Sequence, residues 1–130
     1  MNKKVILLVD DDFSSRALIR KILEMRNYLI VEAANGLYAI EVLKRQHIDL
    51  VITDILMPEM NGYELSQKIY DDFKPLKVIV MTAGGRVGSA DYVKSLCIKE
   101  FFDAILTKPF KPDKMIYTIE SALREEVKVN

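Results

Sequence analysis

The sequence predicts an α/β fold built on a doubly wound parallel sheet, and three observations support this prediction. Five short runs of apolar or β-branched residues alternate with segments whose apolar residues recur at helical spacing. The runs are apolar throughout, which suits strands that are buried on both faces of a sheet. The amphipathic segments between them are suited to cover both faces through right-handed crossovers.

The predicted strands share this apolar or β-branched character and are Val5–Val9, Tyr28–Val31, Asp49–Thr53, Val78–Met81 and Ala104–Leu106. Helix-start residues lie between them. Asp12 and Asn35 are each placed to cap a helix, and Pro112 suits the first turn of the last helix. The result is a regular alternation of strand and helix along the chain.

Length and composition favour a single domain over residues 1–130. A chain of 130 residues has room for one core that buries about two thirds of the unfolded surface. Lys+Arg and Asp+Glu both total 19, so no overall basic field exists to hold nucleic acid or an anionic membrane. The apolar run Val5–Val9 is too short for a signal peptide or a membrane span. The single cysteine, Cys97, cannot form an internal disulfide, and we expect a cytoplasmic protein.

Polar residues close most of the predicted strands. Asp10 and Asp11 follow the first strand, Asp54 the third, Thr82 the fourth and Lys108 the fifth. In open α/β sheets the carboxyl ends of the strands form one edge, and ligands bind there. Carboxylate, hydroxyl and ammonium groups are therefore expected to converge at this edge.

These groups suit a hard divalent cation and a phosphoryl group. Clustered carboxylates repel one another, which raises their pKa values unless a cation neutralises them, and oxygen ligands suit Mg²⁺. A carboxylate can also be the nucleophile that accepts a phosphoryl group, and that chemistry needs positioning and charge neutralisation above all. Thr82 and Lys108 supply donors for such a group.

The segments VDDD, TDILMPEMNG, MTA and KPF, in this order and spacing, resemble the receiver domain of two-component response regulators over essentially the whole chain. The resemblance implies a CheY-like, flavodoxin-like sheet of five strands in the order 2-1-3-4-5. It also implies a phosphoacceptor switch that catalyses only its own phosphorylation and dephosphorylation. The implied partner is a sensor histidine kinase or a histidine phosphotransfer protein, with an output partner that the sequence does not specify.

The resemblance further implies the roles of individual residues. Asp54 would be the phosphorylated aspartate. Mg²⁺ would be bound by Asp10, Asp11 and Asp54, together with the backbone carbonyl of Leu56. Thr82 would hydrogen-bond the phosphoryl oxygens, and Lys108 would pair with them, aimed inward by a cis peptide bond to Pro109.

Several residues depart from the receiver pattern or have simpler explanations. Ile105 stands where many receivers have an aromatic residue, so an aromatic rotamer switch is not available there. The segment after Thr82 is long and rich in glycine, with Gly84, Gly85 and Gly88. Phe101 and Phe102 are expected to pack in the core, with an exposed docking patch as the alternative. We expect Asp12 to be a helix cap rather than a metal ligand, and His47 to be a solvated loop residue.

Other functions remain open at this point. The segment DDDFS carries Asp10, Asp12 and Ser14 at alternate positions, as haloacid-dehalogenase-type Mg²⁺-dependent phosphatases do, although those enzymes usually need a larger core and a cap. A receiver-like binding module without phosphorylation is a further alternative, and so is a receiver cut from a longer regulator. In solution the chain is expected to be a monomer or a phosphorylation-dependent dimer.

Overall fold

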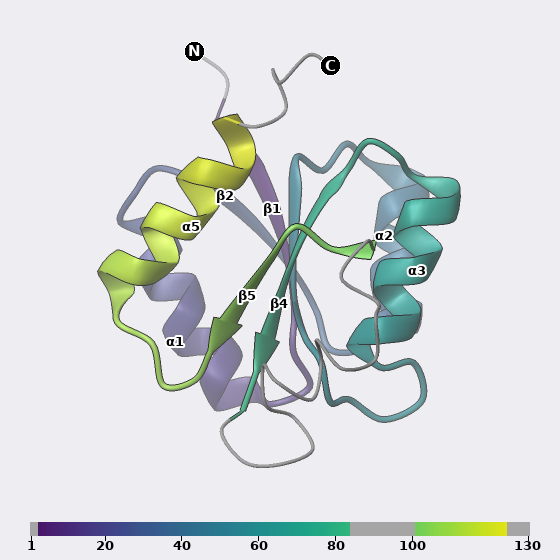
Figure 1. The fold of residues 1–130 in the computed structure, drawn as a ribbon, viewed down its shortest axis with the longest axis horizontal. Helices are drawn as coiled ribbons and strands as arrows, with labels where there is room; N and C mark the ends of the chain where they lie inside the picture. The colour runs from purple at the N-terminus through teal and green to yellow at the C-terminus, as the bar shows by residue number, and fades with distance from the viewer. Residues whose placement is uncertain (1–2, 84–100, 125–130) are drawn as a thin grey trace.

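The computed structural model describes residues 3–83 and 101–124, and these form one parallel sheet with helices on both faces (Figure 1). The elements in chain order are β1 (Val5–Val9), α1 (Phe13–Glu24), β2 (Leu29–Ala33), α2 (Gly36–Arg45), β3 (Leu50–Asp54), α3 (Gly62–Asp72), β4 (Lys77–Thr82), β5 (Ala104–Thr107) and α5 (Pro112–Arg124). The predicted alternation of strand and helix is confirmed for these residues.

The five strands are parallel and lie in the order β2-β1-β3-β4-β5, as the resemblance implied. The first strand agrees with the prediction, and the others are displaced or extended by one or two residues. The largest difference is in β2, because Glu32 and Ala33 continue the pairing with Leu8 and Val9 of β1. An edge strand pairs through its backbone and needs fewer apolar side chains, so the apolar run understates its length.

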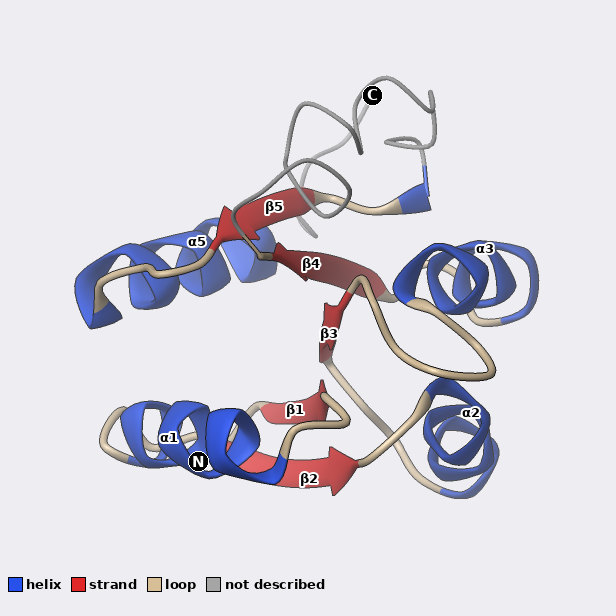
Figure 2. Ribbon diagram, turned by 90° about the horizontal axis from the view of Figure 1, so that it is seen from below, coloured by secondary structure: helices blue, strands red, loops and turns tan. Residues whose placement is uncertain are grey.

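Two cores explain why the strands are apolar throughout. Figure 2 shows α1 and α5 on one face of the sheet and α2 and α3 on the other. Successive side chains of β1 alternate between these faces, so Ile6 and Leu8 pack with α1 and α5, and Leu7 and Val9 pack with α2 and α3. The sheet is therefore buried on both faces.

Helix starts follow the capping residues that the sequence suggested. The Asp12 side chain accepts from the Ser15 N–H (2.9 Å) at the start of α1. The Asn35 side chain accepts from the Tyr38 N–H (2.8 Å) at the start of α2, and α5 begins at Pro112. The predicted cap role of Asp12 is confirmed.

The two aromatic residues before β5, Phe101 and Phe102, differ in burial. Phe102 is buried in the core on the α2 and α3 side, as predicted, whereas Phe101 is half-buried and packs its ring edge-on against Tyr70. The glycine-rich segment from Gly84 onward and Cys97 lie outside the described residues. In residues 3–83 and 101–124, no helix has the length and apolar character needed to cross a membrane.

Candidate phosphoryl and cation site

Asp10 lies directly after β1 and is fully buried. Its N–H donates to the Ala33 carbonyl at the end of β2 (3.1 Å), and its Oδ1 accepts from the Asp12 N–H (2.9 Å). Its Oδ2 lies 3.5 Å from Lys108 Nζ and has no hydrogen-bond partner in the part of the chain that the structure describes. Buried polar atoms are normally hydrogen-bonded, so this oxygen is available to an incoming group.

Asp54 is the last residue of β3, and its carboxyl group is half-buried. The strand continues into a loop that folds back on itself, because the Gly62 N–H donates to the Ile55 carbonyl (2.8 Å). A Cβ at position 62 would lie 2.5 Å from the Asp54 carbonyl oxygen and 2.7 Å from Ile55 Cα. Only glycine allows this approach, so Gly62 helps to define where the Asp54 carboxyl group sits.

Sequence reasoning gave Gly62 no role, although a sequence pattern for it was present. Asn61 caps α3 by accepting from the Glu64 N–H (2.9 Å), and the Glu64 side chain accepts from the Asn61 N–H (3.0 Å). This capping box can be recognised from the segment NGYE alone. It places the first turn of α3, and therefore Gly62, against the end of β3.

The three aspartates named from the sequence come together at this edge. Asp10, Asp11 and Asp54 each offer a carboxylate oxygen, and these atoms all lie within 4.8 Å of one another. Asp12 caps α1 and is not a member of this cluster. Three carboxylates so close, one with a buried oxygen that has no hydrogen-bond partner among the described residues, are chemically suited to a hard divalent cation.

The electrostatics of Asp54 reflect this crowding. Burial raises the pKa of the Asp54 carboxyl above its usual range, and the nearby Asp10 carboxylate raises it further. The Lys108 ammonium and the Leu56 N–H oppose the rise in the Asp54 pKa without cancelling it. The ionised form of Asp54 is thus incompletely compensated by the protein's own groups.

Lys108 supplies the positive charge at this edge. Its Nζ lies 3.3 Å from Asp54 Oδ2, 3.5 Å from Asp10 Oδ2 and 3.4 Å from Ser15 Oγ. The Lys108–Pro109 peptide bond is cis, as the resemblance implied. The Ser15 hydroxyl, to which the sequence analysis assigned no role, reaches the ammonium from the first turn of α1.

Thr82 is the last residue of β4 and is completely buried. Its hydroxyl Oγ1 has no hydrogen-bond partner among residues 3–83 and 101–124. Its carbonyl accepts from the Lys108 N–H (2.7 Å), which ties the ends of β4 and β5 together. The edge therefore presents a buried hydroxyl close in the fold to an ammonium group.

Two further residues named from the sequence lie near this edge. The Leu56 N–H acts to lower the pKa of the Asp54 carboxyl, and Leu56 is 45% exposed. Ile105 is half-buried and packs against the core on the α2 and α3 side. An aliphatic side chain therefore occupies the position where an aromatic switch would stand.

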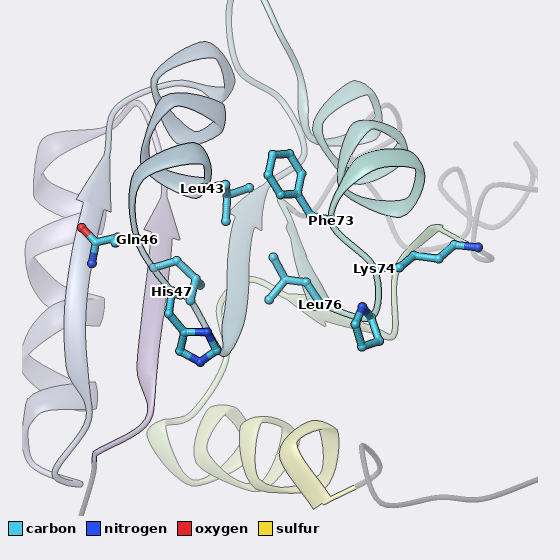
Figure 3. A pocket seen from close by; sticks show the side chains of 8 residues that line it. Leu43, Gln46, His47, Phe73, Lys74 and Leu76 are labelled. Atoms are coloured by element: carbon cyan, nitrogen blue, oxygen red, sulfur yellow. The ribbon is translucent and has the colours of Figure 1, made fainter.

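A separate hollow of about 370 Å³ lies at the opposite end of the molecule, between the C-terminal ends of α2 and α3 (Figure 3). Leu43, Phe73 and Leu76 line it, and the side chains of Gln46 and Lys74 point away from it. It does not gather the convergent polar groups that the carboxyl edge of the sheet gathers, so it does not compete as the functional site.

A doubly wound parallel sheet with clustered carboxylates, a buried hydroxyl and an ammonium at its carboxyl edge is the arrangement of a phosphoacceptor domain in two-component signalling. A family model for the response regulator receiver domain matches residues 6–120. The chain belongs to this family.

Individual relatives agree with this assignment. The chain is 36% identical over 124 residues to the "Probable transcriptional regulator ycf27" of Cyanophora paradoxa, covering 95% of this chain and 50% of that protein. It is 33% identical over 115 residues to the "Sporulation initiation phosphotransferase F" of Bacillus subtilis (strain 168), covering 88% of this chain and 89% of that protein. The chain thus spans half the length of the first relative and most of the second.

A solved structure of a receiver domain has the same fold as this chain. The CheY-like response regulator receiver domain protein from Methanospirillum hungatei JF-1 superposes with a TM-score of 0.85 at 30% sequence identity, and 98% of each chain is covered. The predicted family and fold are confirmed by these comparisons.

Proposed function

We propose that this chain is a receiver domain over residues 1–130 whose Asp54 accepts a phosphoryl group from a phosphohistidine donor. The observation that supports this most strongly is the convergence of Asp10, Asp11 and Asp54 beside two buried polar atoms that lack hydrogen-bond partners in the described chain, Asp10 Oδ2 and Thr82 Oγ1. Such atoms are costly to bury, so their presence favours a ligand that completes them.

In the proposed reaction, an Asp54 carboxylate oxygen attacks phosphorus, a new P–O bond forms, and the P–N bond to the donor histidine breaks. The donor nitrogen leaves with the bonding electron pair. Lys108 Nζ, 3.3 Å from Asp54 Oδ2, is within reach of an oxygen of the transferred group. The Thr82 hydroxyl has no competing partner among the described residues and is free to donate to another oxygen.

The residues present fit a divalent cation. Asp10, Asp11, Asp54 and the backbone carbonyl of Leu56 would hold Mg²⁺. When bound, the ion would neutralise negative charge on the carboxylates and on the phosphoryl oxygens. Asp10 Oδ2, which has no hydrogen-bond partner among the described residues, and the raised pKa of Asp54 support this donor set.

Partners follow from this chemistry. Receiver domains exchange phosphoryl groups with histidine kinases or phosphotransfer proteins, and relatives of the chain include the "Sensor histidine kinase CheAY" of Helicobacter pylori (strain ATCC 700392 / 26695). We propose such a donor for this chain. Phosphorylation would then alter the carboxyl edge and regulate an output partner, as a monomer or through a phosphorylation-dependent dimer.

Intact-mass spectrometry after incubation with Mg²⁺ and acetyl phosphate tests the proposal without a known kinase. We expect one added phosphoryl group per wild-type chain, none with a chelator, and none in Asp54→Asn. Asp12→Asn is the matched control, because asparagine also caps helices and Asp12 lies outside the acidic cluster. Full labelling of Asp54→Asn, or loss of labelling in Asp12→Asn, would contradict the assignment.

The phosphatase alternative is less well supported. It needs the Asp12 carboxylate at the reaction centre, but that group is exposed and occupied in capping α1 through the Ser15 N–H. We therefore expect one stable acyl phosphate per chain and no steady turnover of a phosphomonoester. Assay with p-nitrophenyl phosphate at saturating Mg²⁺ separates the two functions.

A further inference from the structure

The guanidinium of Arg16 contacts the backbone of the acidic pair directly. Arg16 Nη1 donates to the Asp10 carbonyl oxygen at 2.6 Å. Its Nε donates to Glu32 Oε1 at 2.7 Å, and the guanidinium carbon lies 5.7 Å from the centre of the Phe13 ring. The Arg16 side chain is only 14% exposed, so this is a largely buried and well-constrained arginine rather than a surface charge.

This contact bears on both aspartates of the pair. The Asp10 carbonyl belongs to the peptide that joins Asp10 to Asp11, so a hydrogen bond to it orients the plane from which both side chains extend. Asp10 also donates its N–H to the Ala33 carbonyl, accepts from the Asp12 N–H, and forms an ion pair with Lys108 Nζ through Oδ2. Arg16 adds a charge-assisted hydrogen bond to the backbone carbonyl, which none of these contacts involves.

Glu32 holds Arg16 in place from the neighbouring strand. Glu32 pairs in register with Leu8 of β1, two residues before Asp10. Its Oε1 accepts from Arg16, and its Oε2 accepts from Arg20 Nη1 at 2.5 Å. Arg16 therefore connects α1, β2 and the carboxyl end of β1 through its bonds to Glu32 and to the Asp10 carbonyl.

We propose that Arg16 is a positioning residue for the divalent-cation site, acting through the Asp10–Asp11 peptide with Glu32 as its anchor. This inference rests on the proposed function, because it assumes that Asp10 and Asp11 bind the cation. Residues that orient metal ligands from outside typically change metal affinity about 10- to 100-fold when they are replaced.

The chain provides a matched control in Arg20. Arg20 also belongs to α1 and also pairs with Glu32, but its other hydrogen bond goes to Glu24 Oε2 at 2.8 Å. Loss of Arg20 removes an ion pair from Glu32 and leaves the contact between Arg16 and the Asp10 carbonyl. Any effect of losing an α1 arginine in general should appear equally in both variants.

The test titrates Mg²⁺ alone into the full chain and measures its dissociation constant by isothermal titration calorimetry, without any phosphodonor. We expect Arg16→Gln to weaken Mg²⁺ binding about tenfold. Arg16→Lys, which keeps the charge but not the forked guanidinium, should lie between Arg16→Gln and the wild type. Arg20→Gln should stay within about twofold of the wild type, since it leaves the Asp10 contact in place.

A second readout separates positioning from general damage. With acetyl phosphate as donor, the Mg²⁺ concentration for half-maximal labelling should rise about tenfold in Arg16→Gln, while the plateau rate stays within about twofold. An unchanged dissociation constant in Arg16→Gln, or an equal loss in Arg20→Gln, would overturn the inference. A wild type that does not bind Mg²⁺ would instead contradict the proposed function itself.

Discussion

The two ends of β3 each carry an aspartate, and the two side chains are equally exposed but behave in opposite ways. Asp49 precedes the strand and Asp54 ends it, and each is 15% exposed. Burial acts to raise the pKa of both carboxyl groups. The net shift nevertheless lowers the pKa of Asp49 and raises that of Asp54.

Asp54 is more deeply surrounded by protein than Asp49, and the two aspartates also have different partners. Asp49 Oδ2 accepts from the Val5 N–H (2.8 Å) and Oδ1 contacts the His47 ring at 2.7 Å, so both carboxylate oxygens are occupied. These bonds outweigh burial and lower the pKa of Asp49. At Asp54, the Lys108 ammonium and the Leu56 N–H are opposed by Asp10, and burial prevails.

A second aspartate at the amino edge of the sheet, Asp103, also has a hydrogen-bonded carboxylate. The Val78 N–H donates to Asp103 Oδ2 (2.8 Å), and the Asp103 N–H donates back to the Val78 carbonyl (2.7 Å). Asp49 and Val5 form the same reciprocal pair between β3 and β1. Aspartates at the amino edge complete the sheet, whereas those at the carboxyl edge leave bonding capacity for a ligand.

The largest expected effect comes from removing the hydrogen-bonded carboxylate of Asp49 at the amino end of β3. Asp49→Ala should lower the free energy of unfolding by about 2 kcal/mol, because it leaves the Val5 N–H and His47 without their partner. In thermal unfolding this corresponds to a fall of about 6 °C. Asp49→Asn, which keeps an acceptor oxygen, should lose about half as much.

The contribution of Asp49 should also depend on pH. Its pKa is lowered in the folded state, so the stability it provides is complete above the unfolded-state value of about 3.9 and is lost as pH falls through the folded-state value. The difference in stability between wild type and Asp49→Ala should therefore shrink in acid. A difference that stays constant through this range would mean that charge has no part in it.

Addition of Mg²⁺ should stabilise the protein through the carboxylates at the carboxyl end of β3 and not through Asp49 at its amino end. At a Mg²⁺ concentration ten times the dissociation constant, the wild type should gain about 1.4 kcal/mol in stability. Asp10→Asn should lose most of this gain, whereas Asp49→Asn should keep it, since Asp49 lies at the opposite end of β3 from the cluster. Differential scanning calorimetry with and without a chelator measures the effect.

Asp54→Asn should stabilise the metal-free protein, the opposite sign to the Asp49 substitutions. The raised folded-state pKa of Asp54 means that ionisation costs stability above that pKa, and that the cost disappears as pH falls below the unfolded-state value of about 3.9. The gain from Asp54→Asn should accordingly be complete at neutral pH and vanish in acid. Urea unfolding at several pH values tests this, and a loss of stability at neutral pH would refute it.

The smallest expected effect concerns the lifetime of the phosphorylated state. Leu56 is exposed beside Asp54 but offers no hydrogen bond to orient an attacking water, and Gly84, which has no side chain, lies outside the described residues. We expect a phosphorylated state that lasts minutes or more. Leu56→Asn should shorten it about threefold, or about 0.6 kcal/mol in activation free energy, and Leu56→Met should not. Decay measured after donor removal that is equal in all three proteins would show that another group positions the water.

Local sequence information determined the elements and the place of the site. Apolar runs predicted the strands because both faces of the sheet are buried, and Asp12 and Asn35 cap helices through contacts three residues away. The convergence of Asp10, Asp54 and Thr82 followed from parallel strands ending at one edge. These inferences depend only on neighbours in sequence and on the direction of the strands.

Only the tertiary structure decided how each acidic residue is used. The bond between the Asp49 carboxylate and Val5 joins residues 44 positions apart, and that between Lys108 and Asp54 joins residues 54 apart. Local patterns carry no information on such pairs. The sequence analysis therefore placed Asp49 in a predicted strand and assigned its carboxylate no partner. The contacts of Arg16 and Gly62 span only six and seven positions, but each involves a backbone carbonyl, and no side-chain pattern in the sequence shows which carbonyl a residue contacts.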